Sequence, residues 1–120
     1  MAYFFDSYAL IEIAEGNKNY EKYLNSDAVT LKENLAELFY FLFRKYDGKT
    51  ALLFFEKFLK IAVELPSSVI PRAMVFRYAH LKKHFSYIDC LGYCYALANK
   101  KVFLTGDRAF QGFEKVEVVR

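Results

Sequence analysis

Four carboxylates from distant parts of the chain are the clearest candidates for catalytic chemistry: Asp6, Glu37, Asp89 and Asp107. Carboxylates brought close together repel one another, and a divalent cation between them relieves that repulsion. A set of ligands that is all oxygen favours Mg²⁺ or Mn²⁺ over zinc or copper. Such an ion activates water and neutralises charge on a phosphodiester, so the chemistry this set suggests is metal-dependent phosphodiester hydrolysis.

Short apolar runs alternate with helical patterns along the chain, and these are the elements that must position the acids. Strands are expected at residues 2–5, 28–30, 61–65, 102–105 and 115–119. Helices are expected at residues 8–14, 19–24, 30–46, 49–60, 67–83 and 86–98. Strands separated by helices predict a three-layer α/β/α fold around a roughly five-stranded parallel sheet. We expect a single domain over residues 1–120.

Parallel sheets bind ligands outside the carboxyl ends of their strands. Asp6 ends the first strand, and Asp107 follows the fourth strand by one residue. The helix that carries Asp89 leads into the fourth strand, so its N-terminus must lie at the same edge. Glu37 lies about 10 Å along its helix if that helix starts after Thr30. It joins the other acids only if the helix stands above the edge.

Each acid also has a purely structural interpretation. Asp6 could cap the first helix, and Asp107 could be an ordinary turn residue. Asp89 stands third in a Ser-x-x-Asp capping box, where a carboxylate satisfies free amides and the helix dipole. Glu37 could be a solvated helix residue.

Three hydroxyl side chains lie next to the acids or at the ends of predicted strands. Ser7 and Thr105 could be local caps, or could orient the neighbouring acids by hydrogen bonds. Thr30 begins Thr30-Leu31-Lys32-Glu33, which predicts a second capping box at the start of the long helix.

The segment between Pro66 and Ile88 contains no acid and several cations. With the Arg that follows Asp107, these cations are the candidate phosphate-binding residues: Arg72, Arg77, Lys82, Lys83 and Arg108. Lysine and arginine bind phosphate backbones without reading sequence. The same residues could instead form solvated positive faces.

Two pairs at helical spacing resemble metal ligands but do not meet the requirements. His80 and His84 share a face of the predicted helix, yet the Glu of a metalloprotease motif is missing between them. Cys90 and Cys94 are only two ligands and cannot complete a zinc site. We expect buried, reduced thiols.

The chain shows no sign of membrane insertion or export. No apolar run approaches the roughly 18 residues of a membrane helix. The first six residues lack a basic region and already contain an acid, unlike a signal peptide. We therefore expect a cytoplasmic protein.

Four segments together closely resemble a PIN domain, and more narrowly a VapC-type toxin ribonuclease. They are Phe5-Asp6-Ser7, Leu35-Ala36-Glu37-Leu38, Ser86-Tyr87-Ile88-Asp89-Cys90-Leu91 and Leu104-Thr105-Gly106-Asp107-Arg108-Ala109-Phe110. The resemblance runs over residues 2–118. It implies a five-stranded parallel sheet flanked by helices, and metal-dependent endonucleolytic cleavage of RNA.

The resemblance also implies roles for individual residues. The family's acids correspond to the four carboxylates above, as catalytic ligands of Mg²⁺ or Mn²⁺, with Thr105 and Ser7 as supporting hydroxyls. Gly106 stands where the family is variable, so it is not expected to matter. Tyr93 stands where the family often has a further acid, so we expect a metal site with fewer carboxylates.

Members of this type usually form homodimers and are silenced by a small antitoxin whose C-terminal segment enters the active cleft. The resemblance thus implies an RNA substrate, an antitoxin and a homodimer. Two alternatives stay open: a PIN nuclease of RNA maturation or decay without an antitoxin, and a non-catalytic module that binds RNA or protein.

Overall fold

The computed structural model describes residues 2–120, so Met1, where the expected domain begins, lies outside it. The strands are β1 (Ala2–Phe5), β2 (Asp27–Leu31), β3 (Ala62–Val63), β4 (Val102–Thr105) and β5 (Val116–Val118). The α-helices are α1 (Ser7–Ala14), α2 (Lys32–Lys45), α3 (Gly48–Leu59), α4 (Val69–Ala79) and α5 (Tyr87–Ala98). Three short 3₁₀ segments are η1 (Lys18–Tyr23), η2 (Leu81–Lys83) and η3 (Arg108–Phe110).

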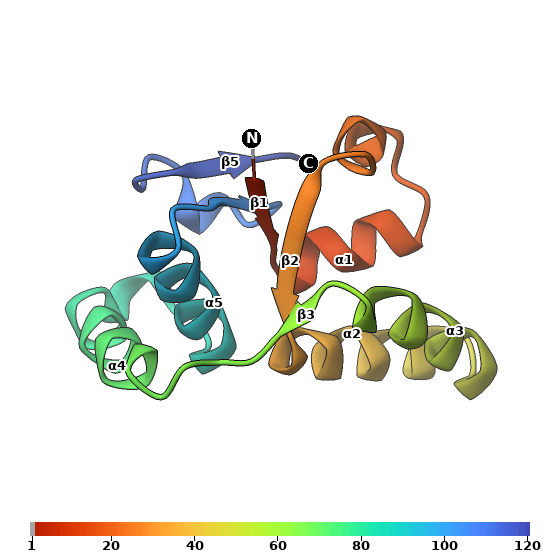
Figure 1. The fold of residues 1–120 in the computed structure, drawn as a ribbon, viewed down its shortest axis with the longest axis horizontal. Helices are drawn as coiled ribbons and strands as arrows, with labels where there is room; N and C mark the ends of the chain where they lie inside the picture. The colour runs from red at the N-terminus through yellow and green to blue at the C-terminus, as the bar shows by residue number, and fades with distance from the viewer. Residues whose placement is uncertain (1) are drawn as a thin grey trace.

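The strands form one five-stranded sheet in the order β3-β2-β1-β4-β5, and every neighbouring pair is parallel. Figure 1 shows α1, α2 and α3 on one side of the strands and α4 and α5 on the other. The predicted α/β fold with a parallel sheet is therefore confirmed. Since β1 lies at the centre between β2 and β4, the residues that follow β1 and β4 leave the sheet side by side.

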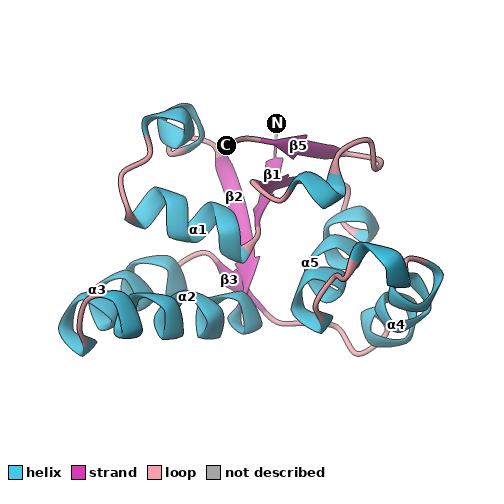
Figure 2. Cartoon of the chain, turned by 180° about the vertical axis from the view of Figure 1, so that it is seen from behind, coloured by secondary structure: helices cyan, strands magenta, loops and turns pink. Residues whose placement is uncertain are grey.

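Alternation along the strands sends side chains into two cores, one on each face. Phe4 and Phe103 pack among α4, α5 and η3, while Phe5 and Leu104 pack among α1, η1, α2 and α3. Figure 2 shows the two groups of helices from behind, separated by the strands. Cys90 and its neighbour one turn later are buried, unpaired thiols in the α5 core, as predicted.

The capping box predicted at Thr30 does not form. The N-cap of α2 is Leu31, which makes no side-chain capping bond. The Thr30 side chain is fully buried, and its Oγ1 donates to the carbonyl of Phe5 at 2.7 Å. Tertiary burial thus redirects this hydroxyl from its own helix to the end of β1, where it fixes the backbone just before Asp6.

The helix predicted over residues 67–83 is wrong in its last four residues, which are not part of an α-helix. Helix α4 ends at Ala79 and a separate 3₁₀ turn follows. His84 has a left-handed backbone (φ 60°), so it does not share a helix face with His80. The His80 ring instead packs on Phe76, with centroids 4.6 Å apart. The third strand is shorter than expected.

In the described part of the chain, no helix combines the length and apolar character that crossing a bilayer demands.

Gly92 lets α5 approach the sheet, and this generates a stability prediction. A Cβ at Gly92 would lie 2.9 Å from Phe4 Cε1 and 3.5 Å from Phe103 Cε1. Alanine gains up to about 1 kcal/mol of helix propensity over glycine, but overpacking a core costs about 1–3 kcal/mol. We expect Gly92→Ala to lower the free energy of unfolding by about 1–2 kcal/mol in urea denaturation.

The matched control is Gly48→Ala at the start of α3, where the new Cβ would meet Phe43 at 3.6 Å, an ordinary contact. We expect it to be neutral or slightly stabilising. A Gly92→Ala protein as stable as this control would contradict the packing argument.

Candidate active site

Asp6 and Asp107 each follow a strand and cap the helical turn that comes next. Asp6 is buried, with 3% of its surface exposed, and its Oδ1 accepts from the amide of Ala9 at 2.8 Å. The Oδ1 of Asp107 accepts from the amide of Ala109 at 2.9 Å. The structural interpretations of these two acids are therefore correct. They do not exclude a second role, because each capping bond engages one carboxylate oxygen.

Asp89 approaches from α5. It forms the predicted capping box: the Ser86 amide donates to Asp89 Oδ2 at 2.9 Å, and the Asp89 amide donates to Ser86 Oγ at 3.0 Å. The box holds the carboxylate at the N-terminus of a helix that runs back toward β4. Asp89 is therefore fixed at the carboxyl edge of the sheet.

Glu37 reaches this edge although it lies well inside α2. The Ser7 hydroxyl, in the first turn of α1, donates to Glu37 Oε1 at 2.5 Å. Asn34 Nδ2, one turn earlier in α2, donates to Ser7 Oγ at 2.9 Å. The contact between α1 and α2 thus carries Glu37 to the residues that follow β1.

The pKa values of three of these carboxylates are raised, first by burial and in part by the charges of neighbouring acids. Burial raises the pKa of Asp6 to about 7; the Thr105 hydroxyl and Ala9 amide oppose this rise, and the charges of Asp89 and Asp107 add to it. Burial also raises the pKa of Asp89, opposed by its Ser86 bonds and reinforced by the charge of Asp107.

The pKa of Glu37 rises in the same way, through burial, against its Ser7 bond and with the charge of Asp89. Acids from four segments therefore occupy one electrostatic neighbourhood, in which a cation would favour the ionised forms.

The chemistry of this donor set fits a hard divalent cation, since every ligand would be an oxygen. Within residues 2–120, however, no three Asp, Glu, His or Cys side chains are arranged so that they could hold one ion. Each carboxylate instead accepts a hydrogen bond from a partner of its own: the amide of Ala9, the Ser7 hydroxyl, the Ser86 amide or the amide of Ala109. Shared ligation therefore requires an arrangement of these side chains that differs from the one in the structure.

Glu37 and Asp89 line a groove between helices, which we call the α1–α2 groove. It has a volume of about 440 Å³ and is lined by Ser7, Tyr8, Ile11, Glu37, Tyr40, Phe41, Arg44, Ser86 and Asp89. Sequence reasoning missed Tyr8, Tyr40, Arg44 and the buried Asn34. For Tyr40 and Arg44 the available signal was helical spacing, since residues three and seven positions after Glu37 share its face of the helix.

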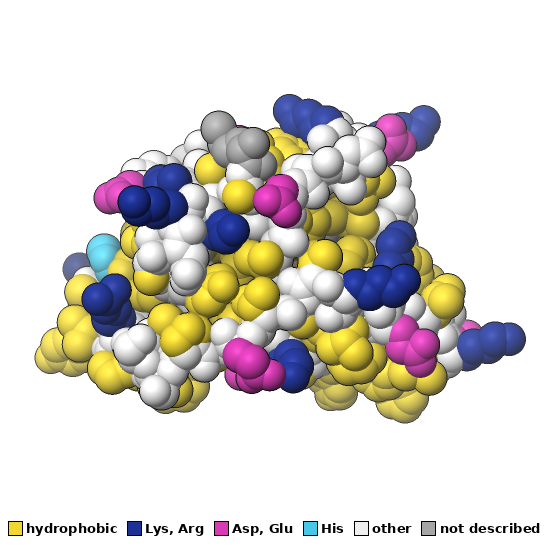
Figure 3. Space-filling view, in the orientation of Figure 1, with side chains coloured by type: hydrophobic (Ala, Val, Ile, Leu, Met, Phe, Trp, Pro, Cys, Tyr) yellow, Lys and Arg dark blue, Asp and Glu magenta, His cyan; other side chains and the backbone are white. Residues whose placement is uncertain are grey.

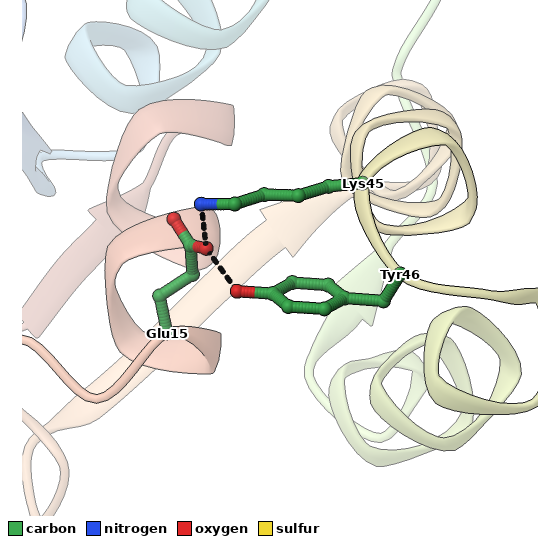
Figure 4. A network of polar contacts seen from close by, with 3 residues as sticks. All are labelled: Glu15, Lys45 and Tyr46. Carbon is green, nitrogen blue, oxygen red and sulfur yellow. Dashed lines mark hydrogen bonds and ion pairs between the residues drawn. The ribbon is translucent and has the colours of Figure 1, made fainter.

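A polar network lies beyond one end of the groove. The Glu15 carboxylate accepts from Lys45 Nζ and from the Tyr46 hydroxyl, both at 2.5 Å (Figure 4). These bonds tie the end of α1 to the end of α2. The two helices are therefore held together beside the groove, and the charge of Lys45 is neutralised.

The predicted phosphate-binding cations come from three elements: Arg72 and Arg77 from α4, Lys82 and Lys83 from η2, and Arg108 from η3. On the face of the molecule in Figure 3, Lys and Arg side chains are spread out, with apolar side chains between them. The role of the five cations stays a prediction. Arg77 has a structural partner, because its Nε donates to the carbonyl of Phe85 at 3.1 Å.

Gly106 has a packing role that the sequence did not suggest. A Cβ at this position would lie 2.0 Å from Cε1 of Tyr8, so the tyrosine ring rests directly on the glycine backbone. This contact sets the position of Tyr8, one of the side chains that line the groove.

The raised pKa of Asp6 predicts a pH-dependent stability. Folding favours the protonated form of Asp6. The contribution of this carboxyl group to the free energy of unfolding is therefore fully present below the unfolded pKa of about 3.9, and it is lost as pH rises through the folded pKa of about 7. In metal-free protein, Asp6→Asn retains a capping oxygen without the charge. We expect it to exceed the wild type by on the order of 1–3 kcal/mol at pH 8 and to match it near pH 4.

Urea denaturation at the two pH values, with a chelator present, measures this difference. The prediction fails if the difference in free energy of unfolding between the wild type and Asp6→Asn is the same at both pH values. Asp6 would then titrate normally.

Comparison with solved structures shows the same fold. A chain of the toxin–antitoxin complex from Klebsiella pneumoniae superposes with a TM-score of 0.75 at 13% identity, covering 97% of this chain and 96% of that one. VapBC2 from Rickettsia felis, bound to a DNA fragment from its promoter, gives 0.77 at 16% identity, with 99% and 98% covered. VapC20 from Mycobacterium tuberculosis, a sarcin–ricin loop cleaving toxin, gives 0.73 at 15% identity, with 94% and 92% covered.

At these identities the likeness establishes the fold alone. No curated protein sequence matches the chain. The family model for the PIN domain matches residues 3–116, a span that includes all four carboxylates. This chain therefore belongs to the PIN domain family.

Proposed function

We propose that this protein is a metal-dependent endoribonuclease that hydrolyses RNA phosphodiester bonds. The observation that carries the proposal is the coupling of four carboxylates at the carboxyl edge of the sheet, with the pKa of Asp6 raised to about 7. Membership of the PIN domain family supports a nuclease. Carboxylates under mutual repulsion in a partly buried site are what a hard divalent cation stabilises.

In this proposal Asp6 and Asp89 are the main ligands of Mg²⁺ or Mn²⁺, and Glu37 and Asp107 orient water. When bound, the ion would supply an activated water molecule and would neutralise charge on the phosphodiester. Ser7 holds the carboxylate of Glu37.

Thr105 acts on two acids at once. Its hydroxyl favours the ionised form of Asp6 and accepts from the amide of Asp107 at 3.0 Å. Removing this hydroxyl would therefore disturb the carboxylate of Asp6 and the backbone at Asp107.

The similar solved structures include a toxin–antitoxin complex and a VapBC complex. On that ground we propose a cytoplasmic toxin of a toxin–antitoxin pair, with a small antitoxin as partner and a homodimer as the active form. A PIN nuclease of RNA maturation or decay is the alternative. A small DNA-binding antitoxin encoded beside this chain would favour the toxin, and its absence would favour the alternative.

The direct test is cleavage of structured RNA with Mn²⁺ by Asp6→Asn and Asp89→Asn proteins. We expect each substitution to lower the rate by more than about 100-fold, since even partners behind the ligands of a metal are worth about 10–100-fold.

The matched control is Asp27→Asn. Asp27 is exposed at the start of β2, at the opposite edge of the sheet, so this change removes the same charge away from the site. We expect it to leave the rate unchanged. Undiminished cleavage by folded Asp6→Asn protein would overturn the assignment.

Metal binding is tested without activity by calorimetry and thermal melting. We expect Mn²⁺ at about 100 times its Kd to stabilise the wild type by about 2.7 kcal/mol, and to stabilise Asp89→Asn much less. If Mn²⁺ neither binds to the wild type nor changes its Tm, the non-catalytic binding module becomes the better description.

A further inference from the structure

The α1–α2 groove contains a cation as well as carboxylates. Glu37, Tyr40 and Arg44 lie three, then four, residues apart, so they stand in a row along one face of α2. Seven residues of helix place Arg44 about 10 Å along the axis from Glu37. An anion bound at Arg44 would therefore lie in the same groove as the acids, a short way along it.

The charge of Arg44 is available to a ligand. In the part of the chain that the structure describes, the ion pairs are Lys32–Glu64 and Lys45–Glu15, and neither includes Arg44. The adjacent Lys45 is the one that Glu15 neutralises (Figure 4). The guanidinium of Arg44 lies 5.2 Å from the centroid of the Tyr40 ring, a cation–π contact that orients it without neutralising it.

Tyr40 gives the groove an aromatic surface. It is 61% exposed although it is a large ring, and it stands between Glu37 and Arg44 on the helix. An exposed ring beside a cation is the combination that binds single-stranded nucleic acid, since the ring stacks on a base and the cation holds a phosphate. A paired duplex keeps its bases stacked inside and would leave the ring unused.

We propose that single-stranded RNA lies along α2 in the α1–α2 groove, where Arg44 binds a phosphate that flanks the scissile one and Tyr40 stacks on a base. This inference rests on the proposed ribonuclease function and adds to it the residues that position the substrate. Arg44 and Tyr40 are substrate-binding residues in this scheme, and neither takes part in the chemical step.

The test measures binding of a fluorescent single-stranded RNA oligonucleotide by anisotropy, at several KCl concentrations and with a chelator that stops metal-dependent cleavage. We expect Arg44→Ala to weaken binding about tenfold and to reduce the slope of log affinity against log salt by about 0.7, the value for one phosphate contact to a single strand. Arg44→Lys should keep most of the slope.

Lys57→Ala is the matched control. Lys57 is an exposed cation on the neighbouring helix α3, outside the residues that line the groove. We expect it to keep both the affinity and the salt slope. An Arg44→Ala protein with the same slope and affinity as Lys57→Ala would overturn the assignment of Arg44.

Tyr40 is tested separately. We expect Tyr40→Leu to weaken binding of the single strand about tenfold and Tyr40→Phe, which keeps the ring, to bind as the wild type does. Equal affinity of the wild type for single-stranded and duplex RNA, or equal binding by the two Tyr40 variants, would contradict base stacking.

Cleavage of the same RNA with Mn²⁺ separates the two levels of the proposal. The expected result for Arg44→Ala is a KM increase of about tenfold with kcat little changed. If the unmodified protein cleaves RNA and Arg44→Ala has unchanged KM, the inference fails while the proposed function stands. If the unmodified protein does not cleave RNA, the proposed function fails, and the anisotropy measurements alone then decide whether RNA binds in the groove.

Discussion

Negative charge is concentrated at the carboxyl edge of the sheet, and the surrounding helices and turns are arranged around it. Parallel β1 and β4 lie side by side and deliver Asp6 and Asp107 to neighbouring positions. Helix α5 brings Asp89 back to the same place. Burial and mutual repulsion both oppose ionisation here, and the pKa of Asp6, about 7, reflects that opposition. The surroundings must therefore compensate.

Compensation comes from ordinary helix capping. Amides at the first turns of α1, α5 and η3 donate to the three aspartates, and the Ser7 hydroxyl donates to Glu37. Capping and a site for a cation are therefore not competing explanations of these acids. Each capping bond orients a carboxylate at a helix start and engages one of its oxygens.

The sequence predicted best where local rules decide the structure. The capping box before Asp89 follows from spacing alone, and so does the strand before Thr105. The prediction of a capping box at Thr30 failed, because a buried tertiary contact with β1 outweighs the local cap. The pattern over residues 67–83 predicted one helix, because hydrophobic periodicity does not show that the α-helix ends at Ala79 and that a 3₁₀ turn follows.

The candidate site could be predicted only in part for the same reason. Three acids follow from topology, because residues after parallel strands share an edge. The position of Glu37 depends on how closely α1 packs on α2, which Asn34 and Ser7 fix in space. Arg44 belongs to the groove only because α2 runs beside it. Interhelical packing of this kind leaves little trace in a single sequence.

We propose that Asp6 belongs to a cluster of carboxylates that holds a divalent cation. Carboxyl ¹³C NMR of Asp6, titrated with and without Mg²⁺, tests this proposal. We expect a midpoint near 7 in metal-free protein and a clear fall when Mg²⁺ is added. A midpoint near the ordinary Asp value of about 3.9, unchanged by Mg²⁺, would contradict it.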